Sequence, residues 1–419
     1  MVKGEITVPG DKSISHRALL FGALAEGVTE IGGFLPGEDC LSTLACLRAL
    51  GVEIEEIDTT HLKVIGKGPQ SLLPPKQVLD CGNSGTTARL LLGILSSLPF
   101  TSTLTGDESL RKRPMGRVVE PLRSMGAKIE GESNGKFLPL IIRGKRLKGI
   151  KYHLPVASAQ LKSALILAAF LAGEEMEIVE PAVSRDHTER MLNYLGAELE
   201  NRDRVIKVRP GKLIGKPINV PGDISSAAFF IVAAAIQPSS ELIIKNVGVN
   251  PTRTGIIDAL RKMGADIKII AAKKEEGEPA AGLLVKGRAL TGREISGPLI
   301  PRLIDEIPVL AVAAACAQGK TVIKDAAELK VKETDRIKAV VTELKKLGVK
   351  IEELPDGMVI EGGRPLKGAK VKTYGDHRMA MALEVANLVA EGEVVLDDKQ
   401  CVNISFPGFF ELMQKIKYE

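Results

Sequence analysis

The residues best suited to do chemistry are cations placed in short polar turns. Each turn follows a short strand pattern and precedes an Ala/Leu-rich helix pattern, and a helix start attracts anions through its free N–H groups and partial positive charge. Arginine binds carboxylate and phosphate with two donors, whereas lysine acts as a point charge. The polar and charged residues of these turns are Lys12, Ser13, Arg17, Asn83, Ser84, Gly85, Thr86, Arg89, Ser158, Gln160, Lys162, Asp376, His377 and Arg378. Such turns predict a site for small, multiply anionic substrates.

Two further runs are rich in cations. The segment GDESLRKRPMG at 106–116 contains Arg113, and the segment VKETDR at 331–336 contains Lys332 and Arg336. A single arginine at a helix start is more often a solvated surface residue. Because cations recur at equivalent positions in several turns, we interpret them as one anion-binding set.

Two carboxylates lie among these cations and are candidates for proton transfer. Asp305 is in the run LIDEIP, and Glu333 stands between Lys332 and Arg336. A carboxylate surrounded by cations stays ionised and can take a proton from a bound hydroxyl group. For Asp305 the alternative is a helix N-cap, which the spacing supports equally well. We interpret His16 as a packed structural histidine.

The sequence does not match the residue spacing that other kinds of functional site require. The run GKT at 319–321 has Ala314 where a phosphate-binding loop needs its first glycine, and GNSGT has Thr86 where a nucleophile elbow needs its last one. No HExxH motif, no His/Cys/carboxylate cluster at metal spacing and no GxGxxG after a strand is present. We therefore expect no metal, no nucleotide and no covalent nucleophile.

Composition excludes several classes of protein. The net charge is +5 over 419 residues, aromatic residues make up 3% and tryptophan is absent, which argues against a nucleic-acid binder that stacks bases on rings. The five cysteines form no CxxC pair, which argues against a disulfide framework or a zinc site. The N-terminus is polar, and apolar runs such as 164–172 are too short to span a bilayer. We expect a cytoplasmic protein that does not enter membranes.

The turns belong to a repeated unit. The strand–turn–helix pattern starts near residues 5, 78, 151, 217, 293 and 369, and a second pattern, a helix ending in glycine before an alternating strand, surrounds Gly51, Gly126, Gly196, Gly264 and Gly348. The C-terminal run FFELMQKIKYE would be its sixth copy. Units of about 70 residues are long for a solenoid and favour compact α/β domains.

The same turn, Pro-Gly-Asp, occurs at 9–11 and at 221–223. Both copies are suitable places for the chain to pass between two halves of three units each. We predict one domain formed by residues 1–12 and 222–419 and a second formed by 13–221. Ligands commonly bind in the cleft between two such domains.

Seven motifs in this order resemble the EPSP synthases, or 3-phosphoshikimate 1-carboxyvinyltransferases. The motifs are GDKSISHR, GNSGTTAR, KRPMG, SAQ, LIDE, VKETDR and YGDHRMAM, and the resemblance runs from Val8 to Phe410. It implies a two-domain inside-out α/β barrel with six βαβαββ repeats, three in each domain. It also implies that phosphoenolpyruvate donates its enolpyruvyl group to the 5-hydroxyl of shikimate 3-phosphate, that no cofactor is needed, that glyphosate occupies the phosphoenolpyruvate site, and that the protein is a monomer.

The resemblance assigns roles to individual residues. Shikimate 3-phosphate is expected to contact Lys12, Ser13, Arg17, Ser158, Ala159, Gln160, Arg185, Asp305 and Lys332. Phosphoenolpyruvate is expected to contact Lys12, Asn83, Gly85, Arg113, Gln160, Arg336 and Arg378. Asp305 would take the hydroxyl proton, while Glu333, together with Lys12, would handle the proton of the methylene carbon.

Three positions depart from the pattern of many family members. Ala159 stands where a second serine often contacts phosphate, Glu328 replaces an asparagine, and Ile404 replaces a lysine. Two related alternatives differ in substrate. The sister enzyme that uses UDP-N-acetylglucosamine carries a reactive cysteine in the loop that here reads RKRPMG, and an RNA-end-processing protein would need more aromatic residues than this chain has.

Overall fold

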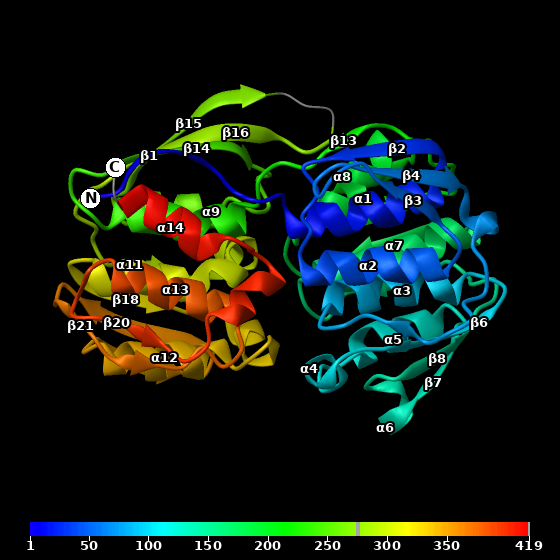
Figure 1. The fold of residues 1–419 in the computed structure, drawn as a ribbon. Coiled ribbons are helices and arrows are strands. Elements are labelled where there is room, and N and C mark those ends of the chain that lie inside the picture. Colours follow the sequence, from blue (N-terminus) through cyan, green and yellow to red (C-terminus); the bar gives the residue numbers. More distant parts are fainter. Residues whose placement is uncertain (274–276, 418–419) are drawn as a thin grey trace. The chain divides into compact units, whose positions relative to one another are not determined.

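The computed structural model describes residues 1–273 and 277–417, which form an α/β structure of two compact units (Figure 1). Unit 1 contains residues 1–9, 221–273 and 279–417, and unit 2 contains residues 10–220 with 277–278.

The repeating element is a four-stranded sheet with one fixed topology. In each copy a first strand runs parallel to a second, and the fourth strand pairs antiparallel with both the second and the third. The sheets have the orders β13-β2-β4-β3, β5-β6-β8-β7 and β11-β12-β10-β9 in unit 2, and β1-β14-β16-β15 and β17-β18-β20-β19 in unit 1. Where the two parallel strands are consecutive in the chain, as in β5–β6, β9–β10 and β17–β18, a crossover must join them, and a helix lies in each crossover.

Unit 2 contains the following strands and helices. The strands are β2 (Glu26–Gly32), β3 (Glu53–Glu56), β4 (Leu62–Lys67), β5 (Leu79–Asp80), β6 (Thr101–Thr105), β7 (Lys128–Gly131), β8 (Leu140–Arg143), β9 (Lys151–His153), β10 (Met176–Val179), β11 (Leu199–Arg202), β12 (Val205–Val208) and β13 (Ile218–Asn219). The helices used below are α1 (Lys12–Leu24), α2 (Glu38–Ala49), α3 (Gly85–Ser96), α4 (Glu108–Arg111), α5 (Gly116–Ser124), α7 (Ala159–Ala172) and α8 (His187–Tyr194).

Unit 1 is built in the same way. Its strands are β1 (Lys3–Thr7), β14 (Glu241–Gly248), β15 (Asp266–Lys273), β16 (Ala280–Lys286), β17 (Glu294–Ile295), β18 (Gly319–Ile323), β19 (Lys350–Leu354), β20 (Gly357–Gly362), β21 (Leu366–Lys367), β22 (Lys370–Val371), β23 (Ala390–Glu391) and β24 (Val395–Leu396). Its helical segments include α9 (Ile224–Ala235), α10 (Gly255–Lys262), η3 (Ile304–Glu306), α11 (Ile307–Cys316), η4 (Ala327–Val331), α12 (Arg336–Lys346), α13 (His377–Asn387), η5 (Gln400–Ile404) and α14 (Phe409–Lys417).

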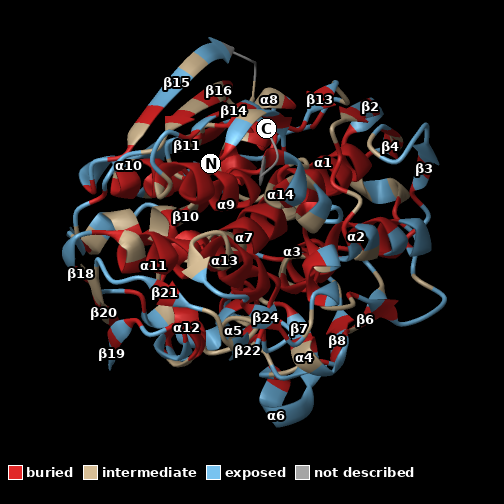
Figure 2. Ribbon diagram, turned by 60° about the vertical axis from the view of Figure 1, so that its left-hand side comes forward, coloured by how far each residue is buried: buried red, intermediate tan, exposed pale blue. Residues whose placement is uncertain are grey.

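The helix that follows each polar turn forms the core of its unit. Helices α3 and α7 in unit 2, and α9, α11 and α13 in unit 1, are buried along nearly their whole length (Figure 2). A Cβ at Gly93 on α3 would lie 2.2 Å from the carbonyl oxygen of Ala164 on α7, so glycine allows the two helices to touch. The sheets lie outside these helices and alternate buried and exposed residues, as in β8. Helices inside and sheets outside give the predicted inside-out arrangement.

The sixth repeat is reduced. Its strands form two short two-stranded sheets, β21-β23 and β22-β24, in place of one sheet of four. The predicted last helix is present as α14, while the final two residues of that prediction, 418–419, lie outside the described residues. The five predicted helix-ending glycines all have positive φ, from +82° at Gly348 to +109° at Gly196, as expected for a left-handed stop signal.

Strands β1 and β13 exchange places between the two units. β1 pairs in parallel with β14 in unit 1, although the helix that follows it, α1, belongs to unit 2. Conversely, β13 pairs in parallel with β2 in unit 2, and the following helix α9 belongs to unit 1. The chain therefore passes from unit 1 to unit 2 after Pro9 and returns after Val220. A Cβ at Gly10 would lie 1.9 Å from the carbonyl oxygen of Gly33, so the first passage needs glycine.

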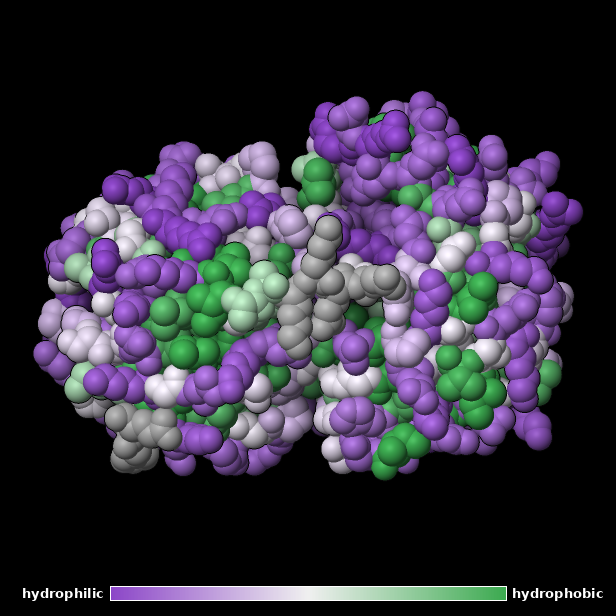
Figure 3. Space-filling model, turned by 90° about the horizontal axis from the view of Figure 1, so that it is seen from above, coloured by the Kyte–Doolittle hydropathy of each residue, from purple (hydrophilic) through white to green (hydrophobic). Residues whose placement is uncertain are grey.

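The surface is polar with scattered hydrophobic side chains. On the face drawn in Figure 3, hydrophilic residues predominate and hydrophobic patches lie among them. Exposed large hydrophobic residues such as Ile57, Leu73 and Ile214 are far apart in the sequence, which is usual for globular proteins. Within residues 1–273 and 277–417, none of the helices combines the length and the apolar character that crossing a membrane requires.

Candidate active site

The first polar turn places a lysine and an arginine at the start of α1. Asp11 caps this helix by accepting a hydrogen bond from the backbone N–H of Ile14 at 2.9 Å. Lys12 is the first residue of the helix, and its Nζ lies 2.9 Å from Oδ2 of Asp39. Arg17 follows one turn later, buried, and donates from Nε to Oγ1 of Thr188 at 2.7 Å. The cap therefore fixes the direction in which both cations point.

Arg17 has a second cation, Arg185, in its vicinity. Burial lowers the pKa of Arg17 to about 10, the carboxylates of Glu189, Asp11 and Glu278 oppose this shift, and the charge of Arg185 adds to it. An anion bound near both guanidinium groups would relieve their repulsion. This pair is therefore a candidate phosphate site.

The second polar turn brings Arg113 onto Asn83. Arg113 donates from Nη2 to Oδ1 of Asn83 at 2.6 Å, and Asn83 in turn donates from Nδ2 to Oδ2 of Asp107 at 2.6 Å. Gly85 begins α3 directly beneath two guanidinium groups. A Cβ there would lie 2.8 Å from Nη1 of Arg89 and 3.7 Å from Nη1 of Arg113. Glycine therefore keeps the space between the backbone and the two guanidinium groups open without displacing Arg89.

Side-chain hydrogen bonds join the third polar turn to the second. Ser158 caps α7 by accepting from the N–H of Leu161 at 3.4 Å, which puts Ala159 and Gln160 in the first turn of that helix. Oε1 of Gln160 accepts a hydrogen bond from Nη1 of Arg89 at 2.7 Å, and its Nε2 donates to Oγ1 of Thr86 at 2.9 Å. The starts of α3 and α7 are thereby held side by side.

A chain of buried hydroxyl groups connects the first turn with the second. Nδ1 of His16 lies 2.7 Å from Oγ1 of Thr43, which lies 2.6 Å from Oγ1 of Thr87, which donates to Oγ of Ser84 at 2.7 Å. Burial, aided by the charges of Lys12 and Arg17 and opposed by Asp39, lowers the pKa of His16 to about 3. His16 is therefore neutral and structural, in agreement with our interpretation.

Unit 1 contributes a separate group centred on Arg336. This side chain is buried and donates to three carboxylates: from Nε to Asp376 at 2.7 Å, from Nη2 to Glu333 at 2.6 Å, and from Nη1 to Asp305 at 3.3 Å. Burial alone would lower the pKa of Arg336, but these three carboxylates outweigh it and raise the pKa well above its ordinary value. Arg336 is permanently charged, and it holds both predicted proton-transfer residues.

Asp305 contacts three cationic side chains. Its Oδ1 lies 3.2 Å from Nζ of Lys332 and 3.3 Å from Nη1 of Arg336, and its backbone oxygen accepts from Nη1 of Arg378 at 3.3 Å. The N-cap position of α11 is occupied by Glu306, whose side chain makes no capping hydrogen bond, and not by Asp305. The helix-cap alternative for Asp305 is therefore wrong.

The predicted residues fall into two groups, one in each unit. Those of unit 2 are Lys12, Ser13, Arg17, Asn83, Gly85, Arg113, Ser158, Ala159, Gln160 and Arg185. Those of unit 1 are Asp305, Lys332, Glu333, Arg336 and Arg378. In unit 1, hydrogen bonds or ion pairs join all five of these residues to one another. In unit 2, Arg17 donates to the backbone oxygen of Ser13 and Arg113 donates to Asn83, while Ser158 and Ala159 are placed by their position at the start of α7.

Arg89 and Asp376 lie in the polar turns and connect other site residues, although neither is among the expected contacts of the two substrates. Arg89 bridges the second and third turns through Gln160. Asp376 both binds Arg336 and caps α13 by accepting from the N–H of Arg378 at 2.9 Å. The signal for Asp376 was present, because an aspartate directly before a helical pattern is a typical N-cap.

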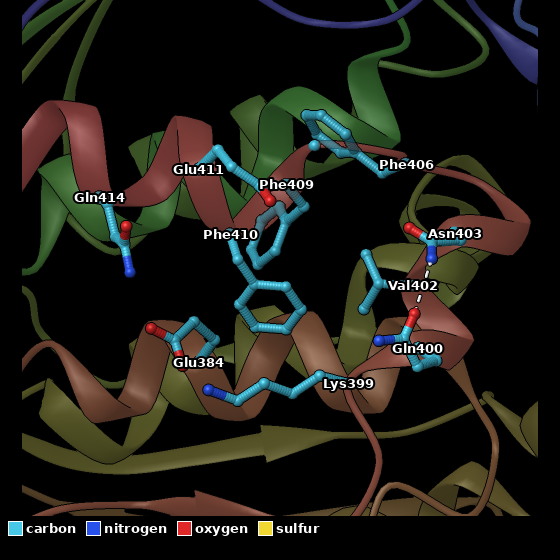
Figure 4. A pocket seen from close by; sticks show the side chains of 11 residues that line it. Glu384, Lys399, Gln400, Val402, Asn403, Phe406, Phe409, Phe410, Glu411 and Gln414 are labelled. Carbon is cyan, nitrogen blue, oxygen red and sulfur yellow. Dashed lines mark hydrogen bonds between the residues drawn. The ribbon is translucent and has the colours of Figure 1, made fainter.

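A pocket in unit 1 contains none of the predicted site residues. It has a volume of about 320 Å³ and lies between η5, α13 and α14 (Figure 4). Nζ of Lys399 lies 5.2 Å from the ring centre of Phe410 at this pocket. Among the described residues, no group of three or more His, Cys, Asp or Glu side chains is arranged to hold a metal ion.

Comparisons with known proteins identify the family of this chain. Residues 1–413 match the family model for EPSP synthase (3-phosphoshikimate 1-carboxyvinyltransferase). The 3-phosphoshikimate 1-carboxyvinyltransferase of Desulforamulus reducens is 54% identical over 419 residues, covering 100% of this chain and 98% of the relative. That of Bacillus thuringiensis subsp. konkukian is 54% identical over 416 residues, covering 99% and 97%.

A solved structure supports the fold. An EPSP synthase structure from Acinetobacter baumannii has a TM-score of 0.89 and 45% sequence identity, covering 99% of this chain and 96% of that one. This likeness confirms the predicted two-domain α/β fold, and the family match confirms the resemblance drawn from the seven motifs.

Proposed function

Because the chain belongs to the EPSP synthase family, we propose that it transfers the enolpyruvyl group of phosphoenolpyruvate to the 5-hydroxyl of shikimate 3-phosphate and releases phosphate. The observation that carries the proposal is the network around Arg336. Two carboxylates, Asp305 and Glu333, are held by one permanently charged guanidinium group. Such a network suits a reaction that removes a proton from the hydroxyl group of one anionic substrate and adds a proton to a carbon atom of the other.

Each substrate is assigned its own set of residues. Shikimate 3-phosphate is bound by Lys12, Ser13, Arg17, Ser158, Ala159, Gln160, Arg185, Asp305 and Lys332. Phosphoenolpyruvate is bound by Lys12, Asn83, Gly85, Arg113, Gln160, Arg336 and Arg378. Ala159 has no hydroxyl group, but as the first residue of α7 it can offer its backbone N–H to an anion.

The proton transfers balance over two steps. In the first, a proton is added to the methylene carbon of phosphoenolpyruvate while the 5-hydroxyl oxygen attacks the adjacent carbon and gives up its own proton, which forms a tetrahedral intermediate. In the second, the new methyl group loses a proton, the double bond re-forms and phosphate leaves. We assign the hydroxyl proton to Asp305 and the carbon-bound proton to Glu333 with Lys12. Arg336 contacts both carboxylates and holds them in place through both steps.

Cations held at fixed positions stabilise the charge of the reaction intermediate. Two polyanionic substrates repel each other, and the intermediate carries their charge in a smaller space. Donors that are held in place before the reaction stabilise such charge without reorganising. The contacts of Arg113 with Asn83 and of Arg336 with Asp376 provide this preorganisation.

The proposal extends to the setting of the enzyme. We propose a cytoplasmic monomer that needs no resident cofactor. Cysteine usage supports a reducing compartment, since the five cysteines are odd in number and form no CxxC pair. Gel filtration with light scattering would test the oligomeric state, and a mass corresponding to two chains would contradict the monomer.

The decisive experiment is phosphate release with purified protein. We expect release only when phosphoenolpyruvate and shikimate 3-phosphate are both present, and none when either is omitted. UDP-N-acetylglucosamine in place of shikimate 3-phosphate should give no release. Release that depends on UDP-N-acetylglucosamine, or no release with the proposed pair, would overturn the assignment.

A further inference from the structure

A buried ion-pair network lies next to Arg17 in unit 2. Nζ of Lys162 is 3.2 Å from Oε2 of Glu180 and 2.7 Å from Oε1 of Glu189, and the three side chains are 0%, 1% and 5% exposed. Ion pairs this deep are costly, because desolvation of the charges offsets much of their attraction. Stability alone is therefore a weak reason for the network.

Helix α7 contains this lysine in an otherwise apolar stretch. Between Leu161 and Phe170 the helix is buried throughout, and Lys162 and Ser163 are its polar residues there. Oγ of Ser163 accepts a hydrogen bond from Nη2 of Arg17 at 2.9 Å and lies 2.6 Å from Oγ1 of Thr188. Two adjacent residues of α7 thus reach toward the surroundings of Arg17.

The first arm of the network fixes the loop that carries Arg185. Glu180 follows the end of β10, and its Oε1 accepts hydrogen bonds from the backbone N–H of Ser184, at 3.2 Å, and from the Ser184 hydroxyl. Its other oxygen faces Lys162. Because Ser184 directly precedes Arg185, the contacts from Lys162 through Glu180 to Ser184 hold the backbone on which the Arg185 side chain is mounted.

The second arm fixes Arg17. Glu189 lies in the first turn of α8 beside Thr188, and Oγ1 of Thr188 accepts from Nε of Arg17 at 2.7 Å. Burial raises the pKa of Glu189, and the positive charge of Lys162 opposes that shift. Lys162 therefore helps to keep the Glu189 carboxylate ionised at this end of α8.

We propose that Lys162, Glu180 and Glu189 are positioning residues that hold Arg17 and the loop carrying Arg185 in place for shikimate 3-phosphate. The inference deepens the proposed function and rests on it. An anionic group bound by a guanidinium group needs that guanidinium group at a fixed position, because two donors must align with two acceptors.

The test measures binding of shikimate 3-phosphate by calorimetry for Glu180→Gln, Ser184→Ala and the double variant. Each single variant should raise the Kd about tenfold, which is the scale of one coupled hydrogen bond. Since both variants cut the same connection, the double variant should bind no worse than Glu180→Gln. In steady-state assays the KM for shikimate 3-phosphate should rise far more than the KM for phosphoenolpyruvate, and far more than kcat falls.

Leu192→Ala is the matched control. Leu192 is buried on the same helix as Glu189, and its truncation lowers stability without touching the ion pairs. Its Kd for shikimate 3-phosphate should equal that of the wild type. An equal rise in Kd for Leu192→Ala, unchanged Kd values for Glu180→Gln and Ser184→Ala, or additive effects in the double variant would each overturn the inference. A wild-type protein that neither binds shikimate 3-phosphate nor releases phosphate would instead overturn the proposed function itself.

Discussion

The carboxylate of Asp376 holds the guanidinium group of Arg336 at two points, with Oδ2 2.7 Å from Nε and Oδ1 3.2 Å from Nη2, and both side chains are buried. The same Oδ1 accepts the backbone N–H of Arg378 at the start of α13. One carboxylate thereby sets the side chain of one cation and the backbone of another.

Replacement of Asp376 by asparagine should lower kcat/KM for phosphoenolpyruvate by about 100-fold. The amide presents a donor toward the guanidinium group and removes the buried counter-charge, so Arg336 loses its two-point contact. Steady-state phosphate release measures the effect. Asp335→Asn is the control, because Asp335 caps α12 without contacting Arg336 through its side chain. A kcat/KM within threefold of the wild type would contradict the positioning role.

Truncation of Arg113 to alanine should remove most of the activity, by about 100-fold, while the protein stays folded. Arg113 is only partly buried and contacts Asn83 and Ser109 at the edge of the second turn, so little packing is lost. Lys112→Ala is the matched control, because the neighbouring side chain is 73% exposed. Near-normal turnover of Arg113→Ala with an unchanged melting curve would remove Arg113 from the site.

Replacement of Gly85 by alanine should raise the KM for phosphoenolpyruvate and reduce inhibition by glyphosate. The added Cβ would lie 2.8 Å from Nη1 of Arg89, so this guanidinium group must move, and the space beneath Arg113 is filled. We expect a change of about tenfold in each constant. Gly93→Ala is not a suitable control, since it would separate α3 from α7, whereas at Gly211 an added Cβ would come no closer than 3.5 Å to the ring of Phe170, which makes Gly211→Ala the matched control. Unchanged inhibition would place the glyphosate site elsewhere.

His16 should make the protein less stable as the pH falls. The folded-state pKa is about 3, whereas an unfolded histidine has a pKa near 6.5. Between these values the unfolded chain binds the extra proton, so the free energy of unfolding decreases as the pH drops. Asp39, Lys12 and Arg17 are the charged groups that act on the ring.

The variant His16→Gln isolates this contribution. It should be less stable than the wild type at pH 7, because the contact with Thr43 is altered, but the difference should shrink by about 2 kcal/mol between pH 7 and pH 5. Denaturant unfolding at each pH measures it. The same substitution at the exposed His153 serves as the comparison. A difference that does not change with pH would show that His16 is protonated in the folded state.

Much of the fold could be predicted from the sequence because its signals are local. Five helices end at a glycine with positive φ, namely Gly51, Gly126, Gly196, Gly264 and Gly348. Five other helices, α1, α3, α7, α9 and α13, begin with an Asp or Ser cap. The reduction of the sixth sheet to two pairs of strands was not predictable. It depends on how β21 to β24 pair, and two-residue strands leave no periodic pattern to read.

The site was predictable in its residue types but not in its connections. Arg336 and Asp305 could be identified as a cation and a carboxylate, but their contact joins positions 31 residues apart. The role of Asp376 as a partner of Arg336, and that of Lys162 as the partner of Glu180 and Glu189, depend on the packing of separate helices and loops. Spacing along the chain contains no information about such contacts.

The exchange of β1 and β13 has a consequence for biosynthesis. As the chain leaves the ribosome, β1 precedes its partner β14 by almost the whole of unit 2, residues 10–220. Within that segment, unit 2 receives its last strand, β13, immediately before the chain returns to unit 1. Synthesis therefore supplies every strand of the unit 2 sheets before β14 is made, and β1 cannot pair until then. A nascent chain stopped near residue 220 would contain these sheets and one strand, β1, without its partner, and it would still lack residues 277–278 of unit 2.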